Sequence, residues 1–178
     1  MELEQRDFDL AGVVRNTVRL MAPVAGNKGL AIETDIAEGD YHLSGDAGRI
    51  RQVLLNLLGN ALKFTSQGHI AVSLKPEPST PDTVLARLTV TDTGIGIAND
   101  AKTRLFQRFG QADASIAREY GGTGLGLAIS ASLARAMGGK IGFESELGKG
   151  STFWVLIPLA RAEGAPPKNA AAEPAGSV

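Results

Sequence analysis

Residues 46–64, DAGRIRQVLLNLLGNALKF, decide the fold, because they form a long helical pattern with two chemically distinct faces. Asp46 precedes the pattern as a predicted N-cap. With about 100° between successive residues, one face is apolar and must be buried; it comprises Ile50, Val53, Leu54, Leu57, Ala61 and Phe64. Asn56, Asn60 and Lys63 share a second face, roughly a third of a turn away, at i, i+4 and i+7 spacing. Two amides and an ammonium group are therefore aligned along the rim of the buried face.

These three polar side chains have two interpretations that spacing alone leaves open. An amide carbonyl oxygen suits magnesium when phosphates supply the negative charge, and a neighbouring lysine can pair with those phosphates. The alternative is that the three residues form an ordinary solvent-exposed helix face.

A mixed set of helices and strands surrounds this helix. A first helix is predicted between the N-cap Asp9 and the breakers Pro23 and Gly26, and a third between about Gly124 and Gly138. Strands are predicted at residues 30–36, 69–76, 83–92, 140–146 and 151–159, with a hairpin loop at 77–82. The interleaving is irregular and includes an antiparallel run. It favours the α/β class, as a two-layer α/β sandwich whose mixed, mostly antiparallel sheet is covered by helices on one face.

Length and charge restrict the function classes. A chain of 178 residues suits one domain, and 18 basic against 19 acidic residues give a net charge of -1. This balance disfavours a nucleic-acid polymer or an anionic membrane as a partner. The chain has no cysteine, which excludes disulfides and thiolate metal sites. It shows no signal sequence and no apolar run near the roughly 18 residues of a membrane span. We expect a cytoplasmic domain without direct membrane contact.

The segment DTGIG, residues 92–96, ends an apolar strand and carries a candidate ligand-binding carboxylate. An ionised Asp92 only accepts hydrogen bonds, so it could receive the exocyclic amino group of an adenine. Gly94 and Gly96 would let the backbone approach a flat ring closely. A simple turn after a strand explains the same residues equally well.

The segment GGTGLGLAIS, residues 121–130, enters the third helix. Glycines around a first helical turn expose backbone N–H groups, and the helix dipole favours phosphate there. A flexible hinge is the alternative, and both can hold together. The sequence contains neither a P-loop nor the dinucleotide fingerprint G-x-G-x-x-G, so a Walker or Rossmann phosphate site is disfavoured.

Five stretches in this order resemble the motifs of bacterial sensor histidine kinases, especially hybrid kinases with a receiver domain. They are NLLGNALKFT (56–65), DTGIGI (92–97), LFQRFGQAD (105–113), GGTGLGLAI (121–129) and GKGSTFWVLIP (148–158). They correspond to the N box, first glycine box, F box, second glycine box and closing glycine motif. The resemblance covers about residues 7–160 and implies the Bergerat-type ATP-binding fold shared with gyrase, MutL and the large heat-shock chaperones.

The resemblance also implies roles for individual residues, with ATP and Mg2+ as cofactors. Asn60 would ligate magnesium with the help of Asn56, Lys63 would contact phosphate, and Asp92 would read the adenine amine. Arg108 in the F box would reach the terminal phosphate. The remaining nucleotide-binding positions would be Gly94, Gly96, Ile97, Phe109, Gly122, Thr123, Gly124, Leu125, Gly126 and Leu127. Thr152 matches a position near adenine in relatives, although a strand residue packed in the core is an equal alternative.

By the same resemblance, the chain is the ATP-binding part of a protein-histidine kinase. Residues 1–6 would be the end of a preceding dimerisation helix or a linker, residues 97–122 a lid, and 161–178 a disordered tail or linker. The partners would be the dimerisation and phosphoacceptor domain of the same kinase and a response-regulator receiver domain. The isolated domain is expected to be a monomer and the parent kinase a homodimer. His42 and His69 match no phosphoacceptor context and are interpreted as structural.

Competing functions remain open at this point. In the hydrolase relatives a glutamate typically stands at the position of Asn56 and activates water, which an amide cannot do at neutral pH. This favours a kinase over an ATPase. A serine-kinase regulator of sigma factors shares the fold, but the stretch FGQADASIAREYGGTG (109–124) is more similar to sensor kinases. A degenerate nucleotide-binding or interaction module is the alternative outside the enzymes.

Overall fold

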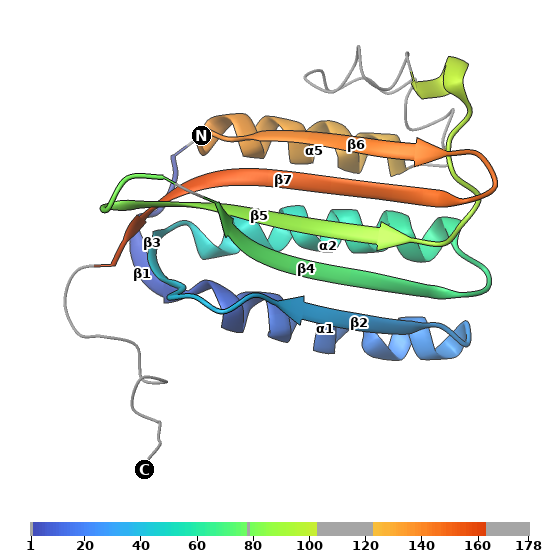
Figure 1. Cartoon of the computed structure of the whole chain (residues 1–178), viewed down its shortest axis with the longest axis horizontal. Coiled ribbons are helices and arrows are strands. Elements are labelled where there is room, and N and C mark those ends of the chain that lie inside the picture. Colours follow the sequence, from blue (N-terminus) through green and yellow to red (C-terminus); the bar gives the residue numbers. More distant parts are fainter. Residues whose placement is uncertain (1, 78, 103–122, 163–178) are drawn as a thin grey trace.

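The computed structural model describes residues 2–77, 79–102 and 123–162 and shows a sheet backed by helices (Figure 1). The strands are β1 (Arg6–Asp9), β2 (Ala31–Ile36), β3 (His42–Gly45), β4 (His69–Glu77), β5 (Thr83–Asp92), β6 (Lys140–Glu146) and β7 (Gly150–Arg161). The helices with assigned bounds are α1 (Leu10–Asn27), α2 (Ala47–Phe64) and α5 (Thr123–Ala136).

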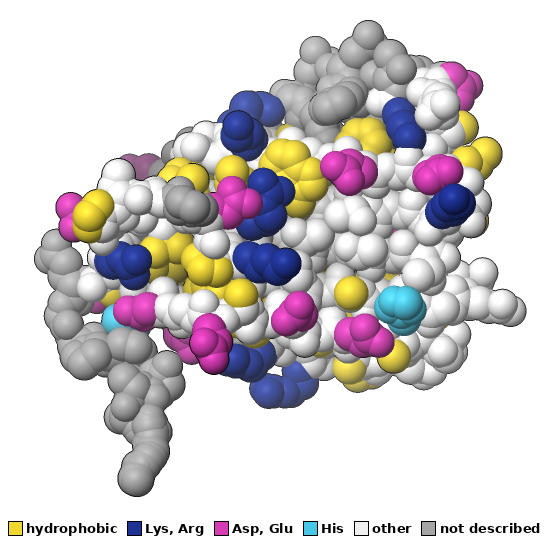
Figure 2. All heavy atoms as spheres, in the orientation of Figure 1, with side chains coloured by type: hydrophobic (Ala, Val, Ile, Leu, Met, Phe, Trp, Pro, Cys, Tyr) yellow, Lys and Arg dark blue, Asp and Glu magenta, His cyan; other side chains and the backbone are white. Residues whose placement is uncertain are grey.

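The sheet is mixed and mostly antiparallel, as the sequence predicts. Its strand order is β1-β3-β7-β5-β4-β2, and β6 pairs with β7. The β2–β4 pair is parallel, whereas the other pairs are antiparallel. Figure 1 shows α1, α2 and α5 side by side on one face of this sheet. Figure 2 shows the opposite face, where acidic and basic side chains are interspersed around a few apolar ones. The two-layer α/β prediction is confirmed.

One hydrophobic core fills the space between the two layers. Strand β5 alternates between buried and half-buried residues along its whole length, so one side of it faces the helices. From α2, the predicted apolar face supplies Ile50, Val53, Leu54, Leu57 and Ala61, all fully or almost fully buried. Burying a side chain such as leucine or isoleucine stabilises a fold by roughly 1.5–3 kcal/mol. Because this packing fixes the rotation of α2, it also fixes where the polar face of α2 points.

The start of α2 is held by Asp46, as predicted. Its side chain accepts a hydrogen bond from the backbone N–H of Arg49 at 3.1 Å and another from Glu4 at 3.0 Å. Asp9 caps α1 in the same way through the N–H of Ala11. Both caps satisfy N–H groups that have no partner within the helix.

Several boundaries differ from the sequence prediction. Helix α1 continues through Pro23 to Asn27, and its end is closed by the N–H groups of Lys28 and Leu30, which both donate to the carbonyl of Ala25. Strands β1 and β3 were not expected, since four residues are too few for a periodic signal. His42 is the first residue of strand β3.

The segments around the domain are partly described. Residues 2–5, which were predicted as a helix end or a linker, have no regular structure, and Arg6 already belongs to β1. Strand β1 pairs with β3 from Arg6 to Asp9. Strand β7 extends to Arg161, one residue into the predicted tail, and the rest of that tail lies outside the described residues. Of the predicted lid, only residues 97–102 are described.

Among the described residues, no helix has the length and hydrophobicity needed to cross a membrane.

Gly139 offers a test of the turn that leads from α5 into β6. A Cβ at this position would lie 2.1 Å from the carbonyl oxygen of Leu156, a backbone atom that cannot move aside easily. Gly139→Ala should therefore lower the free energy of unfolding by about 1–3 kcal/mol, measured by urea denaturation. Gly59→Ala is the matched control, because a Cβ there meets nothing within 4 Å. It should raise stability by about 0.5–1 kcal/mol, since glycine is costly inside a helix. Equal stability of Gly139→Ala and wild type would contradict this packing.

Candidate functional site

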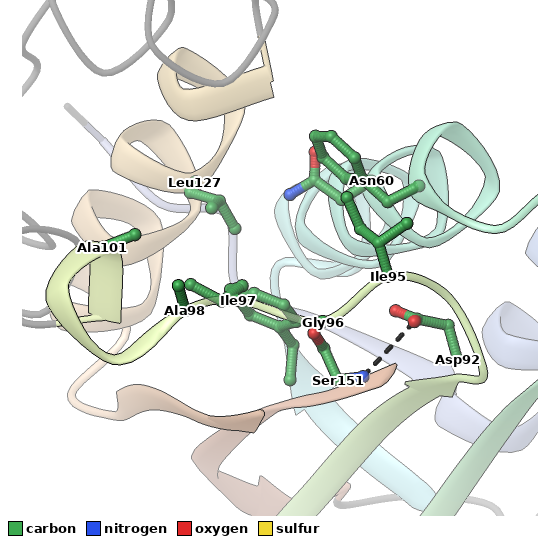
Figure 3. A pocket seen from close by; sticks show the side chains of 11 residues that line it. Asn60, Asp92, Ile95, Gly96, Ile97, Ala98, Ala101, Leu127 and Ser151 are labelled. Carbon is green, nitrogen blue, oxygen red and sulfur yellow. Dashed lines mark hydrogen bonds between the residues drawn. The ribbon is translucent and has the colours of Figure 1, made fainter. Parts of the chain in front are cut away.

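A cavity opens where the end of α2, the segment after β5, the start of α5 and the start of β7 meet (Figure 3). Its volume is about 140 Å3. The walls are mostly apolar and carry few polar groups; the lining residues are Asn60, Phe64, Asp92, Ile95, Gly96, Ile97, Ala98, Ala101, Leu127, Ser151 and Phe153. A concave apolar site with a few placed polar groups is the usual form of a small-molecule site.

Asp92 is the buried carboxylate of this cavity, with 7% of its surface exposed. Its Oδ1 accepts hydrogen bonds from the backbone N–H of Gly94 at 2.9 Å and of Ser151 at 3.3 Å. Figure 3 shows the second of these bonds. Among the described residues Oδ2 has no hydrogen-bond partner, so it is the oxygen available to a ligand. Burial raises the pKa of the Asp92 carboxyl above its ordinary value and prevails over the two backbone hydrogen bonds, which lower it.

The turn after Asp92 is clamped between α2 and the β6–β7 hairpin. The N–H of Ile95 donates to Phe64 at 3.2 Å, and the N–H of Gly148 donates to the carbonyl of Ile95 at 2.7 Å. A Cβ on Gly94 would lie 2.2 Å from the carbonyl oxygen of Phe64. Gly96 has φ 73°, and its Cβ would lie 2.1 Å from the carbonyl oxygen of Glu146. The glycines therefore let the chain approach its own backbone, and Gly96, but not Gly94, lines the cavity.

The polar face of α2 is not an ordinary solvated face. Asn60 is 7% exposed and lines the cavity. Asn56, one turn earlier, donates through Nδ2 to the carbonyl of Gly126 at 3.3 Å and to Ser130 Oγ at 3.1 Å. Its amide thus ties α2 to α5. Lys63 is exposed near the end of α2. Asn56 and Asn60 therefore point into the fold, whereas Lys63 is exposed.

The second glycine stretch is only partly described. Thr123, Gly124 and Leu125 form the first turn of α5, and Leu127 reaches the cavity wall. Gly126 sits against Asn56, where a Cβ would be in ordinary contact at 3.7 Å. Arg108, Phe109 and Gly122 lie outside the described residues.

Thr152 does not join the cavity. Its hydroxyl pairs with Thr91 Oγ1 at 3.2 Å, and both residues face the opposite side of the sheet from their neighbours Ser151 and Asp92. Ser151 lines the cavity instead, and β5 and β7 pair it directly with Asp92. Residues two apart in a strand face the same side, and Phe153 has the character of a core residue. The alternation of the strand could therefore have identified Ser151 as facing the core side.

Five further lining residues were not singled out from the sequence. They are Phe64, which was assigned to the core, Ile95, Ala98, Ala101 and Phe153. No polar signal marks them, because their contribution is shape and apolar surface. Together with Asp92 they provide what a flat heterocycle with an amino group needs: apolar walls and one acceptor.

Curated proteins are similar to this chain over most of its length. The chain is 41% identical over 165 residues to the sensory/regulatory protein RpfC of Xanthomonas campestris pv. campestris, covering 92% of this chain and 23% of RpfC. It is 42% identical over 158 residues to the signal transduction histidine-protein kinase BarA of Escherichia coli K12, covering 88% of this chain and 17% of BarA. This chain thus spans about a fifth of the length of these curated relatives.

Solved structures show the same fold. Full-length ShkA in complex with AMPPNP superposes with a TM-score of 0.75 at 39% identity, over 94% of this chain and 34% of ShkA. The catalytic domain of the histidine kinase ThkA superposes with a TM-score of 0.68 at 27% identity, over 89% of this chain and 98% of that domain. The family model described as histidine kinase-, DNA gyrase B- and HSP90-like ATPase matches residues 45–161. The chain therefore belongs to the family of histidine kinase-, DNA gyrase B- and HSP90-like ATPases, and its fold is that of histidine kinase catalytic domains.

Proposed function

We propose that this chain is the ATP-binding kinase unit of a sensor histidine kinase. It binds ATP with magnesium and donates the γ-phosphate to a histidine on a phosphoacceptor domain of the same kinase, for relay to a receiver domain. The chain would act in the cytoplasm. Support comes from the family membership, from relatives named as sensor proteins and histidine kinases, and from the solved neighbour that binds the ATP analogue AMPPNP.

The observation that carries the proposal is the arrangement of Asp92. One oxygen is held by two backbone N–H groups, and the other is available at an apolar cavity. The amino group of adenine can donate to that oxygen, whereas a carbonyl oxygen at the same ring position would place a second acceptor against it. The site therefore favours adenine over hypoxanthine.

The amides on α2 fit a magnesium ion carried by phosphates. Asn60 is held at the cavity, and its carbonyl oxygen is a hard, neutral donor. Magnesium is commonly bound by one or two protein oxygens together with substrate phosphates, whose charge it neutralises. Lys63 and the backbone amides at the start of α5 would bind the phosphates from either side. Arg108 would reach the terminal phosphate.

Asn56 favours a kinase over a hydrolase. Its Nδ2 donates to the carbonyl of Gly126 and to Ser130, so a glutamate or aspartate here would place an acceptor against an acceptor. The residue is thus committed to α2–α5 packing, and an amide cannot take a proton from water at neutral pH. His42 and His69 do not line the cavity.

Asp92→Asn should fold but lose ATP binding. The asparagine oxygen can keep both backbone hydrogen bonds, while its NH2 group replaces the free Oδ2 and opposes the adenine amino group. We expect a roughly 10- to 100-fold weaker Kd for Mg-ATP by titration calorimetry. Binding of Mg-ITP, whose base carries a carbonyl oxygen in place of the amino group, should be no weaker than in wild type. Unchanged ATP affinity in Asp92→Asn would rule out this role for Asp92.

The same variant tests the raised pKa of Asp92. A carboxyl whose folded-state pKa is raised contributes its stability below the unfolded-state pKa and loses it as pH rises through the folded-state pKa. Asparagine does not titrate. The stability of Asp92→Asn relative to wild type should therefore increase between about pH 3 and pH 7, measured by urea denaturation without nucleotide. The opposite slope would mean that the carboxylate is stabilised in the fold.

Asn60→Ala should remove the magnesium dependence of ATP binding. We expect magnesium to strengthen ATP binding to wild type by roughly tenfold or more over binding in EDTA, as one charge-assisted contact can provide. In Asn60→Ala the two Kd values should converge. Asn60→Asp, which keeps an oxygen donor, should retain the dependence. Full magnesium dependence in Asn60→Ala would exclude Asn60 as a ligand.

The reaction itself is tested with the phosphoacceptor domain of the same gene. Labelled ATP should transfer its γ-phosphate to that domain as an acid-labile, alkali-stable adduct, as expected for phosphohistidine. Hydrolysis by this chain alone should stay well below one turnover per second, because Asp92 is the only carboxylate among the described lining residues and it is assigned to the amino group of the base. Turnover of several per second would favour an ATPase. ATP binding without any transfer would favour a degenerate nucleotide-binding module.

A further inference from the structure

The hydroxyl of Ser145 joins two segments that form the wall of the cavity. Ser145 lies in β6 opposite Ser151 of β7, and Ser151 lies opposite Asp92 of β5. Residues that pair directly across strands project from the same face of a sheet, so the three side chains form a row that ends at the cavity carboxylate. Ser145 itself does not line the cavity, so any influence on a ligand must pass through its partners.

Three hydrogen bonds meet at Ser145 Oγ. The N–H of Ile97 donates to it at 2.8 Å, and it donates to the carbonyl of Gly150 at 3.1 Å. Ser151 Oγ lies 2.7 Å from it. A serine hydroxyl has one hydrogen and two lone pairs, and a carbonyl oxygen only accepts. The hydrogen of Ser145 therefore goes to Gly150, and Ser151 supplies the hydrogen of the bond between the two hydroxyls.

Two of these partners belong to the wall of the cavity. Gly96, Ile97 and Ala98 are consecutive lining residues, so the bond to the N–H of Ile97 holds the middle of that stretch. Ser151 also lines the cavity, and its own N–H donates to Asp92 Oδ1. Figure 3 shows Ile97 and Ser151 on neighbouring parts of the wall. One hydroxyl outside the cavity thus sets the separation of two segments inside it.

The turn before Ile97 is held by backbone hydrogen bonds to α2 and to the β6–β7 hairpin. The Ser145 hydroxyl continues this support at Ile97, where a side chain provides it. Without the hydroxyl, the N–H of Ile97 and the carbonyl of Gly150 would each lose this partner. Polar groups that are left unpaired away from water are costly, so the wall would shift to pair them elsewhere.

We propose that Ser145 is a positioning residue of the base site: its hydroxyl holds the wall at Ile97 against the start of β7, at the spacing that admits a flat base. This inference rests on the proposed ATP-binding function. It assigns to Ser145 an effect on the binding of the base and none on the transfer of phosphate, because the partners of the hydroxyl lie at the base and not at the amides of α2.

Two variants test this role. Ser145→Ala removes only the hydroxyl. Thr91→Val is the matched control, because it also removes one hydroxyl of a cross-strand pair, that of Thr91 with Thr152 at 3.2 Å, on the opposite face of the same sheet. Three quantities are measured: the Kd for Mg-ATP by titration calorimetry, the exchange rate of the Ile97 amide hydrogen by NMR without nucleotide, and KM and kcat for transfer to the phosphoacceptor domain of the same gene.

We expect Ser145→Ala to bind Mg-ATP roughly 3- to 10-fold more weakly than wild type, the range for one lost hydrogen bond. KM for ATP should rise by a similar factor while kcat stays within about twofold, because the wall contacts the base equally in the ground state and the transition state. The Ile97 amide should exchange roughly tenfold faster in Ser145→Ala. Thr91→Val should stay within about twofold of wild type in all these quantities, since its hydroxyl shares no partner with Ser145.

Unchanged ATP affinity in Ser145→Ala would overturn the inference, and so would an equal loss in Thr91→Val. A lower kcat at constant KM would also overturn it, because that result marks a merely structural role. If Ser145→Ala does not fold, Ser145→Cys takes its place under reducing conditions, since a thiol keeps the shape but is a weak donor and acceptor. The same loss of affinity is then expected, and its absence is equally decisive.

Wild type that fails to bind ATP would overturn the proposed function and this inference together. Wild type that binds ATP, with variants at Ser145 that bind it equally well, would overturn this inference alone. The Ile97 amide gives a further separation, because its exchange is measured without nucleotide. Equally fast exchange in wild type and in Ser145→Ala would show that the contact itself does not hold the wall.

Discussion

The Asp92 carboxylate holds together three segments of the chain at the site. Through Oδ1 it joins the end of β5 to the turn at Gly94 and to the start of β7 at Ser151. Both donors are backbone N–H groups, so the geometry depends on the path of the chain and not on flexible side chains. The arrangement keeps an ionisable group in a buried position, and burial is the dominant influence on its pKa. Such a group is costly to a fold, and its cost fits a binding role better than a structural one.

Helix α2 connects this carboxylate to the rest of the domain. Its N-terminus is capped by Asp46, its apolar face is fixed by the core, and its last turn is bonded to Ile95. Because the helix is rigid between these points, Asn56 and Asn60 have little freedom of rotation. One amide packs against α5, and the other lines the cavity. A change in the rotation of α2 would move both amides together. The packing of the core therefore also sets the positions of the polar groups at the site.

Much of the fold could be predicted because its elements are long and regular. Strand β5 and the helix after Asp46 have uninterrupted patterns, and their bounds agree with the structure closely. Strands β1 and β3 escaped prediction because four residues carry no readable period and their partners are distant in the chain. Pro23 was interpreted as a helix end, yet α1 continues past it to Asn27.

The sequence by itself determined which chemical groups are available to form the site. The sequence alone shows Asp92 after an apolar strand, amides at helical spacing and glycine-rich turns, because the periods of helices and strands are local properties. Only the tertiary structure decided which of these groups meet. It selected Ser151 over Thr152 through strand pairing, pressed Gly94 and Gly96 against the chain's own backbone, and brought the Ser145 hydroxyl to the N–H of Ile97. The physical reason is that contacts between distant segments depend on strand register and helix rotation, which the packing of the whole core sets.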